Sequence, residues 1–142
     1  AQLQARRGRA GREVSIHMAA AKGDAIAVQA FIRRGVKVNT PGPLHKSTPL
    51  HWAAGAGKVN TMETLISLGA NVDALSDSNA TPLHQAVLKN HPEAVKLLIR
   101  SNADLNSQNK SGYTPLDYAT ANGRTDLAKL LQTAGAAPGK SL

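Results

Sequence analysis

Three histidines at regular intervals have the clearest potential for chemistry in this sequence. His17, His51 and His84 lie 34 and 33 residues apart, and histidine is both a common metal ligand and a general acid or base near neutral pH. Side chains that share a zinc ion lie about 2 Å from it, whereas equivalent positions in neighbouring repeat units lie on the order of 8 to 10 Å apart. The spacing therefore argues against a common metal site.

The sequence contains no other catalytic pattern. The chain has no cysteine, so it has neither a thiolate nucleophile nor a thiolate metal site. It also lacks the Gly-x-Ser-x-Gly nucleophile elbow, the Gly-x-x-x-x-Gly-Lys phosphate loop and the His-Glu-x-x-His zinc motif. We therefore predict a protein that is not an enzyme and that carries no cofactor or metal.

The composition favours closely packed helices in one domain. The chain has 142 residues, of which 42 % are apolar but only 3 % aromatic, which is enough for one core built mainly from Ala, Leu, Ile and Val. The absence of cysteine fits an intracellular setting, in the cytoplasm, the nucleus or an organelle. No apolar stretch approaches the roughly 18 residues that indicate a membrane span.

Positive charge is concentrated at the start of the chain. The sequence carries 17 Lys and Arg against 9 Asp and Glu, a net charge of +8. Half of that excess comes from Arg6, Arg7, Arg9 and Arg12, which precede the first acidic residue, Glu13. We interpret residues 1–12 as a basic, disordered arm or as the end of a longer linker. Residues 13–142 are expected to form a single, mildly basic domain whose partner has acidic character.

A period of 33 residues organises the rest of the chain. Three copies of one motif begin 33 residues apart, at Thr48-Pro49-Leu50-His51, Thr81-Pro82-Leu83-His84 and Thr114-Pro115-Leu116-Asp117. A weaker copy runs from Val14 to Ala20 and places His17 one residue further from His51 than the period requires. One extra residue is therefore expected around Thr40–Pro43.

Each motif predicts the start of a helix. The threonine hydroxyl can cap free backbone N–H groups of the first turn, and proline is favoured at the first helical position. First helices are expected over residues 15–22, 49–56, 82–89 and 115–122, each followed by a residue that tolerates a left-handed backbone, namely Gly23, Gly57, Asn90 and Gly123. Second helices should end at Gly35, Gly69, Asn102 and Gly135.

The motif and its period resemble the ankyrin repeat over roughly residues 13–137. The resemblance implies an all-α solenoid of helix-turn-helix units with β-turn fingers. It divides the chain into four repeats of about 13–42, 43–75, 76–108 and 109–137, followed by a short tail, 138–142. It also implies that the motif histidines bond to loop backbone.

The sequence departs from the family pattern at a few positions. Lys46 and Asn79 replace the finger glycine that Gly112 retains, so the first two turns are expected to differ in shape from the third. Asp117 replaces the fourth motif histidine, and Gln132 replaces an isoleucine that occupies the same column in the three earlier units. Because a solenoid shields its last unit from water, the fourth repeat is expected to be a C-terminal cap.

The resemblance also implies a binding surface on the finger tips and on the exposed side of the first helices. The residues at these positions are Leu44, His45, Ser47, Trp52, Asp77, Ser78, Gln85, Lys89, Lys110, Tyr113, Tyr118 and Asn122. Trp52 and Tyr113 are the expected apolar anchors, since large aromatic side chains dominate binding hot spots, and Lys89 and Lys110 would contact acidic groups. Packing between neighbouring helices is an open alternative role for the aromatic residues.

These expectations favour a non-catalytic adaptor or scaffold that binds a partner protein with an acidic segment. Two other hypotheses stay open. The arginine arm could bind nucleic acid or another acidic surface, although no aromatic-lined groove or known reader motif accompanies it, which makes nucleic acid the less favoured partner. The chain could also be the targeting module of a larger enzyme.

Overall fold

The computed structural model describes residues 15–139, which form eight α-helices joined by turns and loops. The helices are α2 (Ile16–Lys22), α3 (Ala25–Arg33), α4 (Pro49–Ala56), α5 (Val59–Ser67), α6 (Pro82–Leu88), α7 (Pro92–Arg100), α8 (Pro115–Ala121) and α9 (Thr125–Thr133). This range contains no β-strand, and the predicted all-α class is confirmed. The predicted arm, residues 1–12, and residues 140–142 of the predicted tail lie outside the described residues.

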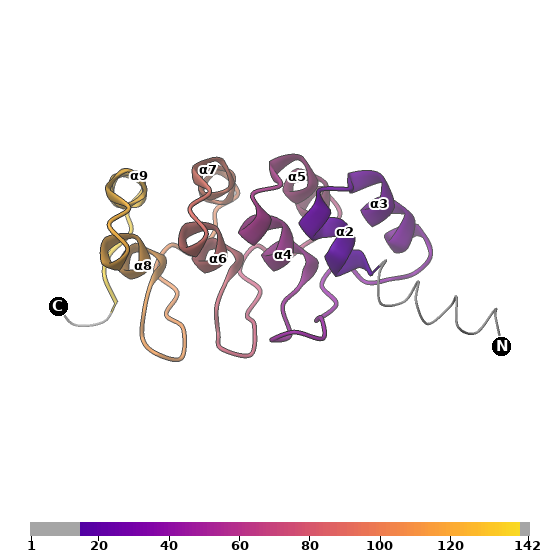
Figure 1. Ribbon diagram of the computed structural model, residues 1–142, viewed down its shortest axis with the longest axis horizontal. Helices are drawn as coiled ribbons and strands as arrows, with labels where there is room; N and C mark the ends of the chain where they lie inside the picture. Colours follow the sequence, from indigo (N-terminus) through magenta and orange to yellow (C-terminus); the bar gives the residue numbers. More distant parts are fainter. Residues whose placement is uncertain (1–14, 140–142) are drawn as a thin grey trace.

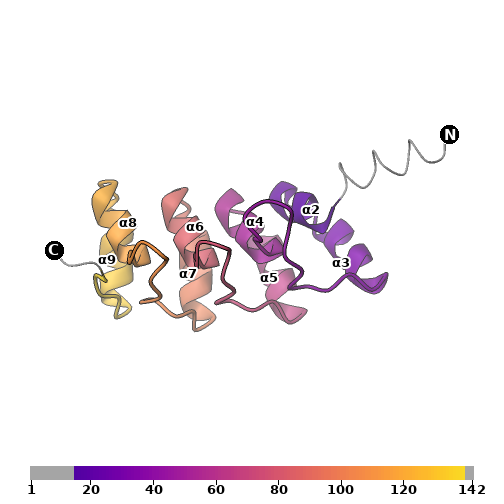
Figure 2. The same ribbon diagram turned by 90° about the horizontal axis from the view of Figure 1, so that it is seen from below.

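The helices stack in two layers, as Figure 1 shows. Helices α2, α4, α6 and α8 form an inner layer in which each packs on the next, and each helix of the outer layer packs on the inner helix before it. Three long loops project from the inner layer as fingers, between α3 and α4, α5 and α6, and α7 and α8. Figure 2 shows the units following one another in a single row, from the α2–α3 pair to the α8–α9 pair. The predicted ankyrin-type solenoid is confirmed.

The predicted capping chemistry is present at the start of the inner helices. In α4, α6 and α8, the threonine side chain accepts a hydrogen bond from the backbone N–H three residues later, and the side chain at that later position accepts one from the threonine N–H. Each capping box is followed by proline at the first helical position. In α2, Ser15 is the N-cap and not the first helical residue. These reciprocal bonds satisfy donors that helix geometry leaves free.

The ends of the inner helices also follow the sequence signals. Gly23, Gly57, Asn90 and Gly123 all have left-handed φ angles, between 63° and 79°. Helices α6 and α8 each end one residue before the predicted position, because Lys89 and Asn122 are their C-caps. The left-handed residue turns the chain directly into the outer helix.

The core lies between the two layers and is built from small and aliphatic side chains. Neighbouring inner helices contact each other more extensively than neighbouring outer helices do, and their facing positions are buried alanines such as Ala53, Ala54 and Ala86. In the outer layer, Leu65, Leu98 and Leu131 occupy one repeat column and are fully buried. Gln132 of the fourth unit is exposed, as expected for an end unit.

Polar side chains join successive units outside this core. Asn39 accepts a hydrogen bond from the backbone N–H of Asn71 at 2.8 Å. The same bond recurs between Asp73 and the Asp104 N–H at 2.8 Å, and between Asn106 and the Ala137 N–H at 2.7 Å. These bonds fix each unit to the next at the base of the fingers, so the stack positions the fingers as one body.

Candidate functional site

The fingers differ in length at their tips. A backbone hydrogen bond closes each one, from Ser76 N–H to Ala80 O and from Asn109 N–H to Tyr113 O in the second and third fingers. In the first finger the equivalent bond runs from Gly42 N–H to Ser47 O, which encloses one more residue. The extra residue therefore lies within Pro43–Lys46, at the tip, and not in the stretch before it.

The fingers also differ in how their tips are held. Asn109 Oδ1 accepts hydrogen bonds at 3.0 Å from the N–H groups of Ser111 and Tyr113, and Ser76 Oγ serves the second finger in the same way. Gly42 occupies this position in the first finger and has no such side chain. A Cβ atom there would lie only 2.9 Å from His17 Cδ2 and 3.0 Å from Ser47 O, so the position accepts only glycine.

Replacement of the finger glycine leaves the left-handed backbone in place. Gly112 has φ 87°, and Asn79 adopts φ 61° at the equivalent position. In the longer first finger, two residues with side chains, His45 and Lys46, have φ 58° and 53°. A left-handed backbone costs a residue other than glycine about 1–2 kcal/mol, so the first finger is the most strained of the three.

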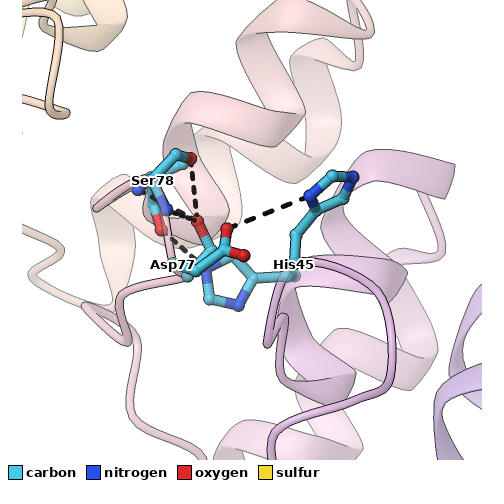
Figure 3. A network of polar contacts seen from close by, with 6 residues as sticks. His45, Asp77 and Ser78 are labelled. Atoms are coloured by element: carbon cyan, nitrogen blue, oxygen red, sulfur yellow. Dashed lines mark hydrogen bonds and ion pairs between the residues drawn. The ribbon is translucent and has the colours of Figure 1, made fainter.

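Neighbouring finger tips are linked to each other. The Asp77 N–H donates to His45 O at 2.8 Å, and the Lys110 N–H donates to Ser78 O at 2.9 Å. His45 Nδ1 also lies 3.9 Å from Asp77 Oδ1, across the gap between the first two fingers (Figure 3). Both of these side chains are well exposed, so their pairing contributes little to stability.

The motif histidines anchor the fingers to the inner helices. The Nε2 atoms of His17, His51 and His84 lie 2.8, 2.8 and 2.9 Å from the backbone oxygens of Thr40, Ala80 and Tyr113, respectively. In His51 and His84, Nδ1 accepts the N–H of the capping threonine. This arrangement leaves Nε2–H as the donor to the finger and confirms the predicted bond to loop backbone.

Burial controls the protonation of two of these histidines. It lowers the pKa of His51 below the ordinary value of 6.5, against the opposing effect of its bond to Ala80 O. Burial likewise lowers the pKa of His84, which its bond to Tyr113 O and the charge of Asp117 raise only in part. Both imidazoles are therefore neutral near pH 7 and structural in role.

Two hollows lie side by side between the finger tips and the inner helices. The first has a volume of about 390 Å³ and is lined by Ala21, Leu44, His45, Ser47, His51, Trp52, Gly55, Ala56, Gln85 and Lys89. The second has a volume of about 330 Å³ and is lined by His45, Ser47, Ser76, Ser78, Ala80, His84, Gln85, Leu88 and Tyr118. His45, Ser47 and Gln85 line both hollows, so the two are adjacent, and we call them together the finger groove.

The structure brings together most of the residues that the sequence placed at a binding surface. The finger groove includes Leu44, His45, Ser47, Trp52, Ser78, Gln85, Lys89 and Tyr118. It does not include Asp77, Lys110, Tyr113 or Asn122. The predicted surface is thus divided between a hollowed part near the first two fingers and a part beyond it.

The residues outside the finger groove have identifiable surroundings. The Tyr113 ring is 38 % exposed and lies 5.8 Å from the Tyr118 ring, so this predicted anchor stands beside the groove. Asn122 is the C-cap of α8, and its side-chain amide donates to Tyr118 O. Lys110 is exposed on the third finger, and its backbone N–H bonds to the second finger.

The two aromatic residues inside the groove are both half-buried. Tyr118 packs edge-on against His84, and its hydroxyl accepts a bond of 2.7 Å from Asn109 Nδ2. Trp52 packs edge-on against His17 with ring centroids 6.3 Å apart, and its buried indole N–H has no hydrogen-bond partner among the described residues. Each ring therefore both supports the stack and lines the groove.

Small residues at one end of the groove were not predicted. Ala21, Gly55 and Ala56 line the first hollow beside Trp52. The signal that could have identified them is a glycine within a predicted helix, at a position where the third unit has Leu88. Leu88 lines the second hollow and is 39 % exposed.

The charge in the groove has one sign. Lys89 contributes an ammonium group to its lining, and none of the described residues that line it carries a carboxylate. Residues 15–139 as a whole carry 12 Lys and Arg against 8 Asp and Glu, which leaves a net charge of +4. A ligand with negative charge is electrostatically favoured there.

Two further classes of site were sought over the same part of the chain. Residues 15–139 contain no group of three or more His, Cys, Asp or Glu side chains arranged to hold a metal ion. Among the helices described, none has the length and apolar character needed to cross a membrane. The residues that line the finger groove offer contact to apolar, hydrogen-bonding and acidic groups.

Comparisons with known proteins agree with this geometry. A family model described as ankyrin repeats (3 copies) matches residues 16–109 and 76–141. A stretch of 36 residues, a quarter of the chain, is 42 % identical to palmitoyltransferase ZDHHC13 of Pongo abelii and of Homo sapiens. That stretch spans only 6 % of the length of each relative. Ankyrin repeats form a non-catalytic fold that generally mediates protein–protein interaction, and this chain belongs to the ankyrin-repeat family.

Proposed function

We propose that the protein is an adaptor that binds a short segment of a partner protein in the finger groove. The observation that carries the proposal is the adjacency of the two hollows, which share three lining residues. The first hollow offers Leu44 and Trp52 and the second offers Leu88 and Tyr118 for apolar contact, and the residues that line both are polar. The family's general role in protein interaction supports the same function.

The rigidity of the groove favours binding. Buried histidines tie the second and third fingers to the helices below them, and backbone bonds link each finger tip to the next. A surface held in its binding shape loses little conformational entropy when a partner docks. Most of the conformational entropy lost on binding would therefore be lost by the partner segment.

The charge distribution supports an acidic partner segment. Lys89 is exposed at the C-cap of α6 and lines the groove, and Lys46 and Lys110 stand exposed on the first and third fingers. Opposite charges raise association rates and suppress wrong partners more than they raise affinity. Acidic residues in the partner would thus fix its orientation, while Leu44 and Trp52 supply apolar contact.

Affinity capture from cell extract tests the proposal with matched variants. The groove variant Leu44→Ala/Lys89→Glu changes two exposed residues of the groove. The control Leu75→Ala/Lys96→Glu makes the same changes at exposed positions outside it. We expect a discrete protein that is recovered by the natural chain and the control and lost from the groove variant. Equal recovery by all three would contradict the proposal.

Two additions to the same experiment address the other hypotheses from the sequence. Deletion of residues 1–12, combined with nuclease treatment, tests binding through the arginine arm. Loss of nuclease-sensitive material with the arm alone would make the chain a charge-driven binder of nucleic acid. A catalytic domain in a longer protein would be compatible with the adaptor function, since this module would then select that enzyme's target. An intracellular location stays a prediction.

A further inference from the structure

Gly55 is the starting point for an inference that rests on the proposed function and makes it more specific. It lies inside α4, as the second-to-last residue of the helix. Glycine within a helix costs about 0.5–1 kcal/mol relative to alanine. Glycines in proteins usually compensate for this cost in one of two ways, by adopting a left-handed backbone or by allowing a close approach.

Neither structural reason applies to Gly55. Its φ angle is not positive, unlike that of Gly57 two residues later. A Cβ atom at position 55 would lie 3.7 Å from Gln85 Cβ and 4.0 Å from Lys89 Cγ, which are ordinary van der Waals distances. By contrast, a Cβ at Gly57 would lie 2.5 Å from His91 Nδ1. Alanine would fit at position 55, so packing does not require the glycine.

The absence of a side chain at Gly55 instead opens the first hollow. Gly55 lines this hollow together with Trp52 and Lys89. The equivalent residue one repeat later is Leu88, which lines the second hollow with its larger side chain. A hollow of about 390 Å³ falls in the size range of protein ligand pockets, roughly 300–1,000 Å³.

We infer that the first hollow is a specificity pocket that accepts one apolar side chain of the partner segment. The walls that would contact it are Leu44, Trp52, Ala21 and Ala56. The first finger, which is one residue longer than the others, contributes Leu44, His45 and Ser47 to the lining. Gly55 lines the same hollow and has no side chain to occupy it.

The charge of the first hollow indicates which residue of the partner lies next to that apolar side chain. Lys89 lines the same hollow, and no carboxylate does. The occupant is therefore a protein segment in which an aliphatic or aromatic residue is followed or preceded closely by Asp or Glu. The apolar group fills the hollow, and the carboxylate lies against the Lys89 ammonium group.

Random 12-residue peptides displayed on phage are the probe for this pocket. The whole chain, residues 1–142, is the bait at roughly physiological salt. The best enriched peptide is then synthesised with a fluorescent label, and its Kd is measured by anisotropy. We expect enriched peptides to carry an apolar residue within two positions of an acidic one.

Three variants separate the pocket from the rest of the surface. Gly55→Leu places in the first hollow the side chain that the third unit has at Leu88, and it should weaken binding roughly tenfold to a hundredfold, as expected for losing one buried apolar side chain. Gly55→Ala should bind less tightly than the natural chain and more tightly than Gly55→Leu. The matched control Ala121→Leu adds a leucine at the equivalent exposed position of α8, outside both hollows, and should leave Kd unchanged.

A charge reversal tests the second half of the inference. Lys89→Glu should weaken binding of the acidic peptide, and replacing the peptide's acidic residue with lysine should restore it. Melting curves of all variants show whether each remains folded, and Gly55→Ala keeps the test valid if the leucine variant does not fold.

The possible results distinguish the two proposals. Enriched peptides that bind Gly55→Leu as tightly as the natural chain, but lose affinity for Leu44→Ala/Lys89→Glu, overturn the pocket and leave the adaptor function standing. Enriched peptides with no preference for an apolar residue also overturn the pocket. If no peptide is enriched on the natural chain, both proposals fail.

Discussion

The first and third fingers occupy equivalent positions in the stack and are built in opposite ways. The third has glycine where the backbone is left-handed, at Gly112, and the Asn109 side chain closes its tip. The first has one residue more and no closing side chain, and its His45 and Lys46 adopt left-handed angles. In the third finger, the left-handed position holds glycine, which adopts that conformation without strain. In the first finger, residues with side chains adopt it, so local sequence and local conformation conflict.

The conflict coincides with the larger of the two hollows of the finger groove, about 390 Å³ against about 330 Å³. The first finger contributes Leu44, His45 and Ser47 to the finger groove, and α4 beneath it carries the helical glycine. Proteins commonly depart from favourable local choices at functional sites and compensate for them elsewhere. The repeated core and the third finger therefore contribute more to the stability of this chain than the first finger does.

The largest effect is expected where the shared core is damaged. Leu98→Ala should reduce the free energy of unfolding by about 2–5 kcal/mol, because a fully buried leucine is replaced by a cavity. Chemical denaturation followed by circular dichroism measures this change. A loss well below 1 kcal/mol would mean that the repeated core is not the main source of the protein's stability.

A smaller effect is expected from acidification, which acts on the anchors of the second and third fingers. Burial lowers the pKa of His51 and His84 below 6.5, so the unfolded chain takes up protons first as the pH falls. The stability that the neutral imidazoles provide is complete above pH 6.5 and is lost as the pH falls from there through their folded-state pKa values.

Denaturation at pH 7.5 and at 5.5 measures this loss. The difference in unfolding free energy between the two conditions should shrink in His51→Gln, which removes one of the two titrating anchors. An unchanged difference would show that other groups dominate the pH dependence.

Substitutions at the left-handed positions of the third and first fingers should change the free energy of unfolding in opposite directions. Gly112→Ala should destabilise the protein by about 1 kcal/mol, because alanine strains the left-handed backbone. Lys46→Gly should stabilise it by about 0.5–1 kcal/mol, since the strain relieved exceeds the added unfolded-state entropy of glycine. Denaturation midpoints report both changes, and a stabilising Gly112→Ala would contradict the assignment of greater backbone strain to the first finger.

The smallest effect is expected at Gly55. Gly55→Ala should stabilise the chain by about 0.5 kcal/mol, because alanine fits and the position lies in the last turn of α4. Thermal melting compares this variant with Gly57→Ala, which should be destabilising because its Cβ would meet His91. Destabilisation by Gly55→Ala would show that the glycine has a packing role after all.

The sequence predicted the repeated parts of the fold well because the same local chemistry recurs in each unit. Threonine before proline marked the starts of α4, α6 and α8, and glycine or asparagine marked the inner-helix ends. The position of the extra residue was less accessible. A residue count places an insertion between two recognisable motifs, but only the bond from Gly42 to Ser47 shows that it lengthens the finger tip.

Many residues of the finger groove were predicted, but its small lining residues were missed. Family positions identified Trp52, Gln85 and Tyr118 on three successive inner helices, and all three line the groove. Tyr113 and Lys110 were predicted from the same family positions but line neither hollow. An exposed side chain does not by itself create a cavity. The hollow at Gly55 depends on a side chain that is missing, which a search for reactive or large residues overlooks.

The substitution at Asp117 changes the direction of one hydrogen bond. His17, His51 and His84 contact carbonyl oxygens of the fingers beside them, whereas Asp117 accepts the Gly139 N–H at 3.1 Å. At this position the fourth unit therefore offers a hydrogen-bond acceptor, whereas the first three units offer a histidine N–H donor. A fifth repeat grafted after this unit would require histidine at position 117. In arrays that keep the aspartate, the interface between the fourth and fifth units should be less stable than any internal interface.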